Sequence, residues 1–276
     1  MSHDLIQVLQ NLGRPRVLVL GDLILDRYIW GDAERVSQEA PVILLQADRS
    51  ETRLGGAANV AHLLRGLEAK VSLAGVVGND RDGQELRDKL ESLEVNCEVV
   101  LTDDSRPTTV KERFIGRAQH RHPHQMLRVD RETRRPLDAR LTQILLRTML
   151  PLVDEHQVVL ISDYGKGVCT PEIVGQVIAR AREVGVPVIV DPRPGEDYSL
   201  YQGATAVTPN RLETFRATGI KVTTTEDAFA AGQKLCAHLE LSHAFVTLDS
   251  DGIAVVHANG EAELLPTGKR QVSRLT

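Results

Sequence analysis

The sequence predicts an α/β protein with a doubly wound, mainly parallel sheet and a small inserted β-lid. Short β-branched runs alternate with segments of helical periodicity along most of the chain, which is the pattern of stacked βαβ units. Several runs end at Gly, Asp, Pro or Asn, where a strand gives way to a loop. The 276 residues are enough to bury one large core, and we treat residues 1–276 as one domain.

The first strand is predicted at residues 16–20, where RVLVL is closed by Gly21 and Asp22. Similar runs occur at residues 70–77, 95–101, 157–162, 186–191, 204–208, 243–248 and 252–258. Helical patterns lie between many of them, at residues 56–67, 82–93, 138–153, 171–184 and 225–239. Doubly wound sheets bind ligands outside the carboxyl ends of their strands, so the residues that follow each strand are the candidates for a site.

Two segments, residues 27–46 and 108–129, break this alternation. The second contains strand-like TVKERFI and QMLRV on either side of a polar loop. We interpret both segments as inserted antiparallel strands that form a lid over the carboxyl edge of the sheet, where they would close a site from water. The charged residues 130–138 are interpreted as a surface connector.

Composition excludes several classes of protein. The 33 Lys and Arg against 38 Asp and Glu give a net charge of −5, and the chain has only one Trp, four Tyr and four Phe. Because nucleic-acid binding needs a basic surface and often aromatic side chains for base stacking, nucleic acid is not expected as a partner. The acidic and polar N-terminus is unlike a signal peptide, and no apolar run approaches the roughly 20 residues of a membrane span, so we expect a cytoplasmic protein. Cys97, Cys169 and Cys236 lack metal-ligand spacing and are expected to be reduced thiols.

Two carboxylates, Asp22 and Asp26, directly follow the first predicted strand. Ionised carboxylates only accept hydrogen bonds, so such a pair suits the hydroxyls of a polyol; the alternative is a turn Asp beside a capping or salt-bridged Asp. Gly55 and Gly56 then open a helix that carries Asn59, and they allow either close approach to a ligand or simply a Gly-rich helix start. Neither GxGxxG nor GxxxxGK[ST] occurs, so dinucleotide and Walker-type sites lose their main support.

Three more clusters follow predicted strands. In SDYGKG, Asp163 and Lys166 lie among two flexible glycines, and Arg193 offers a guanidinium for phosphate oxygens after the next strand. Asn210 and Glu213 lie one turn apart at a helix start, where a carboxylate can organise hydrated Mg²⁺ beside phosphates. The alternative for this last pair is an N-cap residue with its Glu three positions later.

The lid segments add positive charge through Lys111, Arg113 and Arg117, on the side where the lid should face a substrate. Together with the carboxylates, these cations indicate a phosphorylated polyol. The HxHxH run at residues 120–124 could align three imidazoles for a metal, but its proline and polar surroundings favour an exposed lid loop.

In order along the chain stand GDLILDRY, RLGGAAN, LISDYGKG, VIVDPR, TPNRLE and VTLDSDG. This ordered set resembles the ribokinase-like (phosphofructokinase-B type) carbohydrate kinases over essentially the whole chain. It is most similar to the bacterial D-glycero-β-D-manno-heptose 7-phosphate kinases, which also form the kinase half of bifunctional heptose kinase/adenylyltransferases. The resemblance implies ATP-dependent phosphorylation of the C1 hydroxyl of heptose 7-phosphate, on the route to ADP-heptose and the lipopolysaccharide core, and a homodimer paired through lid strands.

The resemblance also implies roles for individual residues. The substrate sugar would be held by Asp22, Asp26, Gly55, Gly56, Asn59 and Asp163. Its 7-phosphate would be held by Lys111 and Arg113, with Lys166 and Arg193 as further phosphate contacts. The ATP and Mg²⁺ side would comprise Arg193, Asn210, Glu213, Thr247, Asp249 and Gly252, with Glu213 holding Mg²⁺ through water.

The family's last catalytic element, a [DN]xTGAGD motif that carries the catalytic base, does not occur in these 276 residues. We therefore expect the chain to stop short of that motif, and we assign no catalytic base; Asp163 and Asp249 both lack the required position after a glycine turn. Three functions stay open: a heptose 7-phosphate kinase, a kinase of another sugar or sugar phosphate, and a non-catalytic module that binds a sugar phosphate or a nucleotide.

Overall fold

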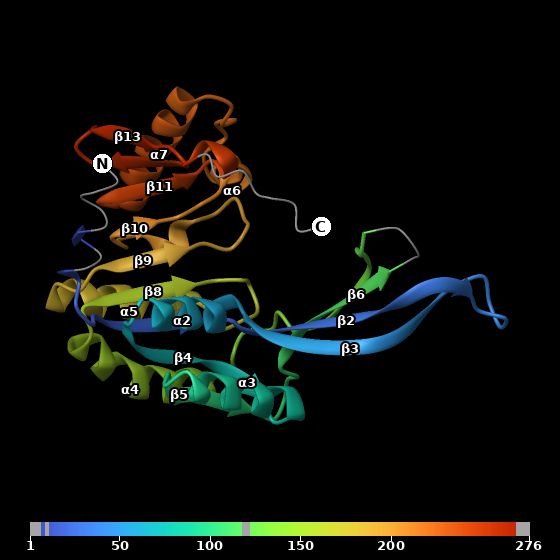
Figure 1. Cartoon of the computed structure of the whole chain (residues 1–276). Coiled ribbons are helices and arrows are strands. Elements are labelled where there is room, and N and C mark those ends of the chain that lie inside the picture. The colour runs from blue at the N-terminus through green and yellow to red at the C-terminus, as the bar shows by residue number, and fades with distance from the viewer. Residues whose placement is uncertain (1–6, 9–10, 118–121, 269–276) are drawn as a thin grey trace. The chain divides into compact units, whose positions relative to one another are not determined.

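The computed structural model describes residues 7–8, 11–117 and 122–268 (Figure 1). The chain divides into two compact units, residues 1–157 with 162–170 (unit 1) and residues 158–161 with 171–276 (unit 2), and each is described by itself. In both units, strands that pair in parallel alternate along the chain with helices. The α/β class predicted from the alternation is therefore confirmed.

The α/β part of unit 1 is a parallel sheet in the order β1-β4-β5. Its strands are β1 (Arg16–Gly21), β4 (Lys70–Gly78) and β5 (Asn96–Asp103), and the helices that pack on it are α2 (Gly56–Gly66), α3 (Arg81–Ser92) and α4 (Ala139–Glu155). Beyond their first residues, β1 and β4 are buried throughout, as expected of parallel strands covered by helices. Side chains cap two of the helices, because Asp80 accepts from the Gly83 N–H and Asp138 from the Leu141 N–H.

A second sheet of unit 1 forms the lid, in the order β3-β2-β6-β7. Its strands are β2 (Leu23–Val36), β3 (Ile43–Gly55), β6 (Thr109–Arg117) and β7 (His124–Arg131), and Figure 1 shows β2 and β3 side by side as they extend away from α2 and α3. The expectation of purely antiparallel lid strands is wrong, since β2 and β6 pair in parallel. The reason is topological: β2 continues from β1 and β6 follows β5, and β1 and β5 belong to one parallel sheet.

Ion pairs fix the lid to the α/β part of unit 1. The guanidinium of Arg27 on β2 lies 2.5 Å from Asp82 of α3 and 3.1 Å from Glu112 of β6. Arg131 of β7 also reaches Glu112, at 2.5 Å. Burial raises the pKa of Glu112, but hydrogen bonds from Arg131 and Arg27 hold it below its usual value. These partly buried pairs set the position of the lid strands against α3.

Unit 2 contains the strand order β13-β12-β11-β10-β9-β8. The strands are β8 (Val158–Ser162), β9 (Val188–Asp191), β10 (Ala206–Val207), β11 (His243–Thr247), β12 (Ile253–His257) and β13 (Ala262–Leu265). The helices are α5 (Pro171–Val184), α6 (Arg211–Thr218) and α7 (Thr225–Leu239), with short 3₁₀ turns η1 (Ser199–Tyr201) and η2 (Asp249–Asp251). Strands β9, β10 and β11 pair in parallel, whereas β12 and β13 add an antiparallel edge. The sequence predicted the strand at residues 252–258 but neither its antiparallel direction nor β13.

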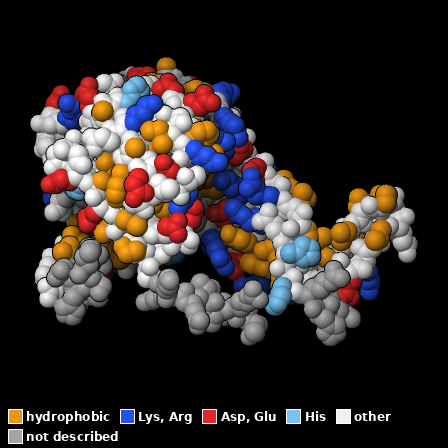
Figure 2. All heavy atoms as spheres, turned by 90° about the horizontal axis from the view of Figure 1, so that it is seen from above, with side chains coloured by type: hydrophobic (Ala, Val, Ile, Leu, Met, Phe, Trp, Pro, Cys, Tyr) orange, Lys and Arg blue, Asp and Glu red, His pale blue; other side chains and the backbone are white. Residues whose placement is uncertain are grey.

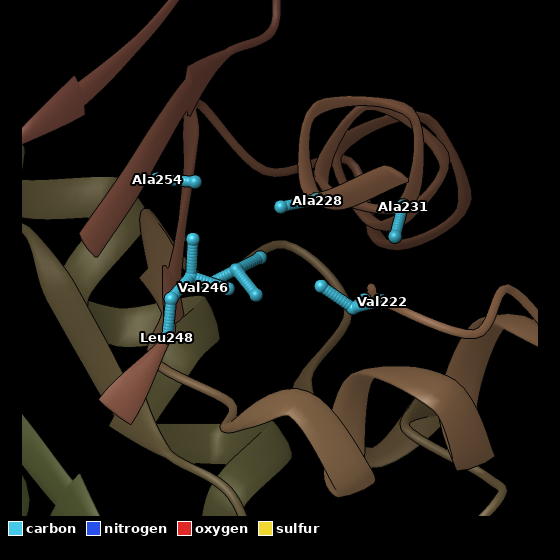
Figure 3. Packing of buried hydrophobic residues seen from close by; sticks show 6 residues of the cluster. All are labelled: Val222, Ala228, Ala231, Val246, Leu248 and Ala254. Atoms are coloured by element: carbon cyan, nitrogen blue, oxygen red, sulfur yellow. The ribbon is translucent and has the colours of Figure 1, made fainter. Parts of the chain in front are cut away.

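Helix α7 packs on β11 and β12 through small side chains. The cluster shown in Figure 3 comprises Val222, Ala228, Ala231, Val246, Leu248 and Ala254. Close approach also requires Gly232 on α7, because a Cβ there would lie 2.6 Å from the Cγ2 atom of Val256. Thr224 and Asp227 cap the helix reciprocally, and hydrogen bonds from Thr223 lower the pKa of Asp227 to about 2.

No disulfide joins Cys97, Cys169 and Cys236. Burial raises the pKa of Cys97 to about 11, which leaves its thiol protonated at neutral pH. Among the described residues, no helix is both long and apolar enough to cross a membrane.

The stability of unit 2 should depend on the protonation of His243. His243 of β11 faces His257 of β12, with their Nδ1 atoms 3.1 Å apart, and burial together with the charge of His257 lowers the pKa of His243. The unfolded chain binds this proton more tightly, so we expect the free energy of unfolding to fall as pH drops below about 6.5. Denaturant titrations at about pH 7.5 and 5.5 measure the loss, which should be smaller in His243→Gln.

The matched control is His238→Gln, which removes an exposed histidine from α7 and should retain the wild-type difference between the two pH values. Equal losses of stability in wild type and His243→Gln would contradict the assignment.

Candidate functional site

The first part of the candidate site lies in unit 1, where Asp22 directly follows β1. Its side chain is only 1% exposed. Its Oδ2 atom accepts the N–H groups of Tyr164 at 2.8 Å and Lys166 at 3.0 Å, and Oδ1 accepts that of Val168 at 3.2 Å. Burial raises the pKa of Asp22 and the nearby charge of Asp163 adds to this, whereas the three N–H donors oppose it. The structure thus uses Asp22, a residue predicted to hold sugar hydroxyls, to hold the backbone of residues 163–168, hereafter the anchored loop.

A guanidinium holds the anchored loop from another side. Arg106, which follows β5 and is 8% exposed, donates to the carbonyls of Lys166 at 3.3 Å and Arg135 at 3.1 Å, and its Nε lies 2.6 Å from Asp103. Gly167 adopts φ +95°, and a Cβ there would lie 2.1 Å from the Arg135 carbonyl oxygen. Sequence reasoning missed Arg106, whose contacts join residues up to 60 positions apart.

The charged side chains of the anchored loop, Asp163 and Lys166, have hydrogen-bond or ion-pair partners within unit 1. The Nζ atom of Lys166 lies 2.5 Å from Glu132, and both side chains are largely buried. Burial raises the pKa of Glu132, but the hydrogen bond from Lys166 holds it below its usual value. Asp163 is buried and accepts the Gly165 N–H at 2.8 Å. The cation predicted for phosphate therefore neutralises a carboxylate of its own unit.

One face of the lid carries a second group of predicted residues. Strand register sets Asp26 of β2 opposite Arg53 of β3 and opposite Lys111 of β6, and Tyr28 opposite Arg113. The guanidinium of Arg113 lies 2.6 Å from Asp26 and 5.2 Å from the centre of the Tyr28 ring. The structure therefore brings together Asp26, predicted to hold sugar, with Arg113, predicted to hold phosphate.

A cavity of about 470 Å³ lies beside Asp26 and Asn59. It is also lined by Tyr28, Thr52, Arg53, Leu54, His62, Lys89, Ser92 and Leu93. Gly55 leaves room for Asp26, because a Cβ there would lie 2.5 Å from the Oδ2 atom of Asp26, and Gly56 adopts φ +55° at the start of α2. The glycine pair thus lets the helix that carries Asn59 begin close to Asp26. A mixture of acceptors, amide and cations around a polar cavity suits a hydroxylated, anionic ligand.

The second part of the candidate site lies in unit 2, at the start of α6. The side chain of Asn210 accepts the Glu213 N–H at 3.0 Å, and that of Glu213 accepts the Asn210 N–H at 2.9 Å. This capping box is the alternative interpretation of the pair, and it leaves Asn210 exposed and Glu213 half-buried at the positive end of the helix. One free carboxylate oxygen at that position fits a hydrated Mg²⁺, which binds through few protein ligands and several waters.

Arg211 connects α6 to the loop after β11. Its guanidinium donates to the carbonyls of Val222 at 3.1 Å and Leu248 at 3.3 Å, and to Asp251 at 2.6 Å. These groups border a cavity of about 420 Å³ lined by Arg211, Thr223, Thr224, Thr225, Leu248, Ser250, Asp251, Leu264, Pro266 and Thr267. Its apolar wall and row of hydroxyls suit a base with an attached sugar.

Four residues predicted for the nucleotide also lie in unit 2. The Thr247 N–H donates to the Pro209 carbonyl at 3.0 Å, which places the end of β11 beside Asn210. Asp249 lies 3.3 Å from the Nε atom of Arg211, and Gly252 takes φ +123° where a Cβ would meet the Leu265 carbonyl oxygen at 2.1 Å. Arg193, after β9, donates its backbone N–H to the Tyr201 hydroxyl at 3.2 Å. The HxHxH run lies partly outside the described residues. Among the residues that the structure describes, no group of three or more His, Cys, Asp or Glu side chains could hold a metal ion.

Asp26 on the lid and the helix-start carboxylate of Glu213 are groups that suit a carbohydrate kinase. The chain belongs to the pfkB family of carbohydrate kinases, whose model matches residues 14–273. Among curated proteins it is similar to the bifunctional protein HldE of Helicobacter hepaticus, at 41% identity over 262 residues that cover 95% of this chain and 53% of that protein. The HldE of Syntrophotalea carbinolica is also 41% identical, over 97% of this chain and 54% of that protein. The chain thus spans about half the length of the curated relatives it matches.

Solved structures share the fold at lower identity. Arabidopsis thaliana ribokinase complexed with ribose and ATP matches with a TM-score of 0.70 and 20% identity, over 92% of this chain and 78% of that one. Phosphofructokinase-2 from Escherichia coli in complex with fructose-6-phosphate matches with a TM-score of 0.69 and 19% identity, over 94% of this chain and 81% of that one. The fold is therefore that of the ribokinase-like enzymes.

Replacing the buried Asp22 by Asn should destabilise unit 1. An Asn at this position turns an NH₂ group toward at least one backbone donor of the anchored loop, and leaving such a buried donor unsatisfied costs about 1–3 kcal/mol. Denaturant unfolding of Asp22→Asn measures the loss. Asp104→Asn, an exposed position after β5, is the control and should stay within about 0.5 kcal/mol of wild type. A stability of Asp22→Asn equal to that of the control would contradict the anchoring role.

Proposed function

We propose that this chain is a heptose 7-phosphate kinase that acts in the cytoplasm, with ATP and Mg²⁺, on the C1 hydroxyl of D-glycero-β-D-manno-heptose 7-phosphate. The observation that carries the proposal is the identity of about 40% with HldE proteins over nearly the whole chain. The cavity beside Asp26 and Asn59 supports a hydroxylated acceptor, and Lys111 and Arg113 on the lid support a phosphorylated one.

Each unit carries its own set of proposed contacts, to the acceptor in unit 1 and to the donor in unit 2. In unit 1, Asp26 accepts hydrogen bonds from sugar hydroxyls, Asn59 accepts or donates them, and both residues thereby orient the acceptor. In unit 2, Asn210, Glu213 and Arg193 would contact the phosphates of the donor, and the exposed helix start at Asn210 supports this role. Mg²⁺ supplies charge neutralisation on those phosphates, and Glu213 is the residue that would hold it through water.

In the reaction, a bond forms between the acceptor oxygen and the γ-phosphorus while the bond from that phosphorus to the β-bridging oxygen breaks. ADP leaves, and the hydroxyl proton passes to a base that we do not assign. Such transfers depend mainly on positioning and charge stabilisation, so the contribution of this chain's residues is to orient the acceptor and to compensate phosphate charge.

We also propose that two copies pair through their lids. Large hydrophobic side chains are exposed on this sheet and its connecting turn, namely Val36, Val42, Ile43, Leu44, Leu127 and Val129. Figure 2 shows hydrophobic side chains gathered at the outer end of the lid. Exposed apolar surface of this kind is typical of an interaction site, and a second lid is an occupant of matching character.

An ADP-release assay on the full-length gene product that contains this chain tests the proposed function. We expect turnover with heptose 7-phosphate and a lower kcat/KM with unphosphorylated heptose. Asp26→Asn should lower kcat/KM by about 10- to 100-fold, because it weakens charge-assisted hydrogen bonds to the acceptor. Asp104→Asn is the exposed control.

Two outcomes would contradict the proposal. Preferred turnover of another sugar would favour a kinase of different specificity. Calorimetric binding of heptose 7-phosphate or of ATP, without ADP release, would favour a non-catalytic binding module.

A further inference from the structure

The lid cations differ in how their charge is compensated. Arg113 lies 2.6 Å from Asp26, and Arg117 pairs with Asp32 and Asp48. The ammonium of Lys111 has no carboxylate within ion-pair distance in the part of the chain that the structure describes; it lies instead 5.5 Å from the centre of the Tyr164 ring. Of the three lid cations that the sequence predicted, Lys111 is thus the one best able to give its charge to a ligand.

The Tyr164 ring faces Lys111, and hydrogen bonds between the backbone of the anchored loop and the side chains of Asp22 and Arg106 fix the position of Tyr164. The Tyr164 N–H donates to the buried carboxylate of Asp22 at 2.8 Å. Two residues further on, Lys166 donates its N–H to the same carboxylate at 3.0 Å and accepts from Arg106 at 3.3 Å. Tyr164 itself is 39% exposed, so its ring lies at the surface, whereas its main chain is hydrogen-bonded to the buried Asp22.

We infer that Tyr164 is a positioning residue that holds the Lys111 ammonium for the phosphate of the acceptor, and that Arg106 acts through the same loop. This inference rests on the proposed function. A lysine side chain loses rotamer entropy when it is ordered, and contact with a ring face imposes part of that loss before the ligand binds. The ammonium keeps three N–H donors, so contact with a ring face leaves donors for phosphate oxygens.

The arrangement has a consequence for specificity. Lys111 interacts with a phosphate as a point charge, and the strength of that interaction depends on where the ammonium lies. A sugar without the phosphate gains nothing from Lys111. Tyr164 should therefore affect the affinity for phosphorylated acceptors and leave the affinity for the free sugar unchanged.

Calorimetry on the full 276-residue chain tests the inference, with heptose 7-phosphate and unphosphorylated heptose as the two ligands. Tyr164→Leu should raise the Kd for heptose 7-phosphate by about three- to tenfold, and Tyr164→Phe, which keeps the ring, should retain wild-type affinity. The Kd for unphosphorylated heptose should not change in either variant. Trp30→Leu is the matched control, since it removes a lid ring that faces a different cation, Arg49, at 4.5 Å.

A double-mutant cycle separates positioning from a general structural effect. In a Lys111→Gln background, Tyr164→Leu should cause no further loss of affinity, because the ring then has no ammonium to hold. Arg106→Lys, which keeps the charge but not the forked donor geometry, should weaken binding of heptose 7-phosphate in wild type and much less in Lys111→Gln. Thermal unfolding of each variant shows whether it is folded.

The outcomes distinguish the inference from the function on which it rests. Wild type without any preference for the phosphorylated acceptor would overturn the proposed function. A clear wild-type preference that Tyr164→Leu leaves unchanged, or that it weakens equally in the Lys111→Gln background, would overturn the positioning role.

Discussion

The buried carboxylate of Asp22 is the constraint on which the rest of unit 1 depends. A charged group that is 1% exposed is costly unless hydrogen bonds replace its water. Here three backbone N–H groups of the anchored loop, more than 140 residues further along the chain, replace that water. The loop must therefore fold over the end of β1, with Gly167 in a left-handed conformation and Arg106 on its carbonyls. The placement of Tyr164, and through it of Lys111, follows from that anchoring.

In unit 2, as in unit 1, an arginine side chain holds main-chain carbonyl groups of a loop. Arg211 donates to the carbonyls of Val222 and Leu248, so a guanidinium holds main-chain oxygens at the border of the second cavity, as Arg106 does in unit 1. The capping box of Asn210 and Glu213 fixes the start of α6 and keeps one carboxylate at the positive end of the helix. In both units, charged side chains shape the loops that carry the candidate ligand-binding residues.

The sequence predicted most of the fold because periodicity and turn residues are local. The strands that end at Gly21 and Ser162 and the helix that starts at Gly56 could be read from short windows. The parallel pairing of β2 with β6 could not, since it depends on the directions of β1 and β5. For the site, Asp26 and Asn59 were found together, but the burial of Asp22 and the pairing of Lys166 with Glu132 arise from contacts between distant segments. A position just after the carboxyl end of a parallel strand places a polar residue near a ligand site, but it does not tell whether the side chain faces a ligand or the backbone.

Hydrogen exchange at three amides tests the central claim, that Asp22 fixes the anchored loop, most directly. The account predicts that the N–H groups of Tyr164, Lys166 and Val168 exchange slowly in wild type, like those of the buried strand β4, although they lie in a loop. In Asp22→Asn these amides should exchange faster while those of β4 keep their protection. Exchange of the three amides in wild type at the rate of an exposed loop would contradict the account.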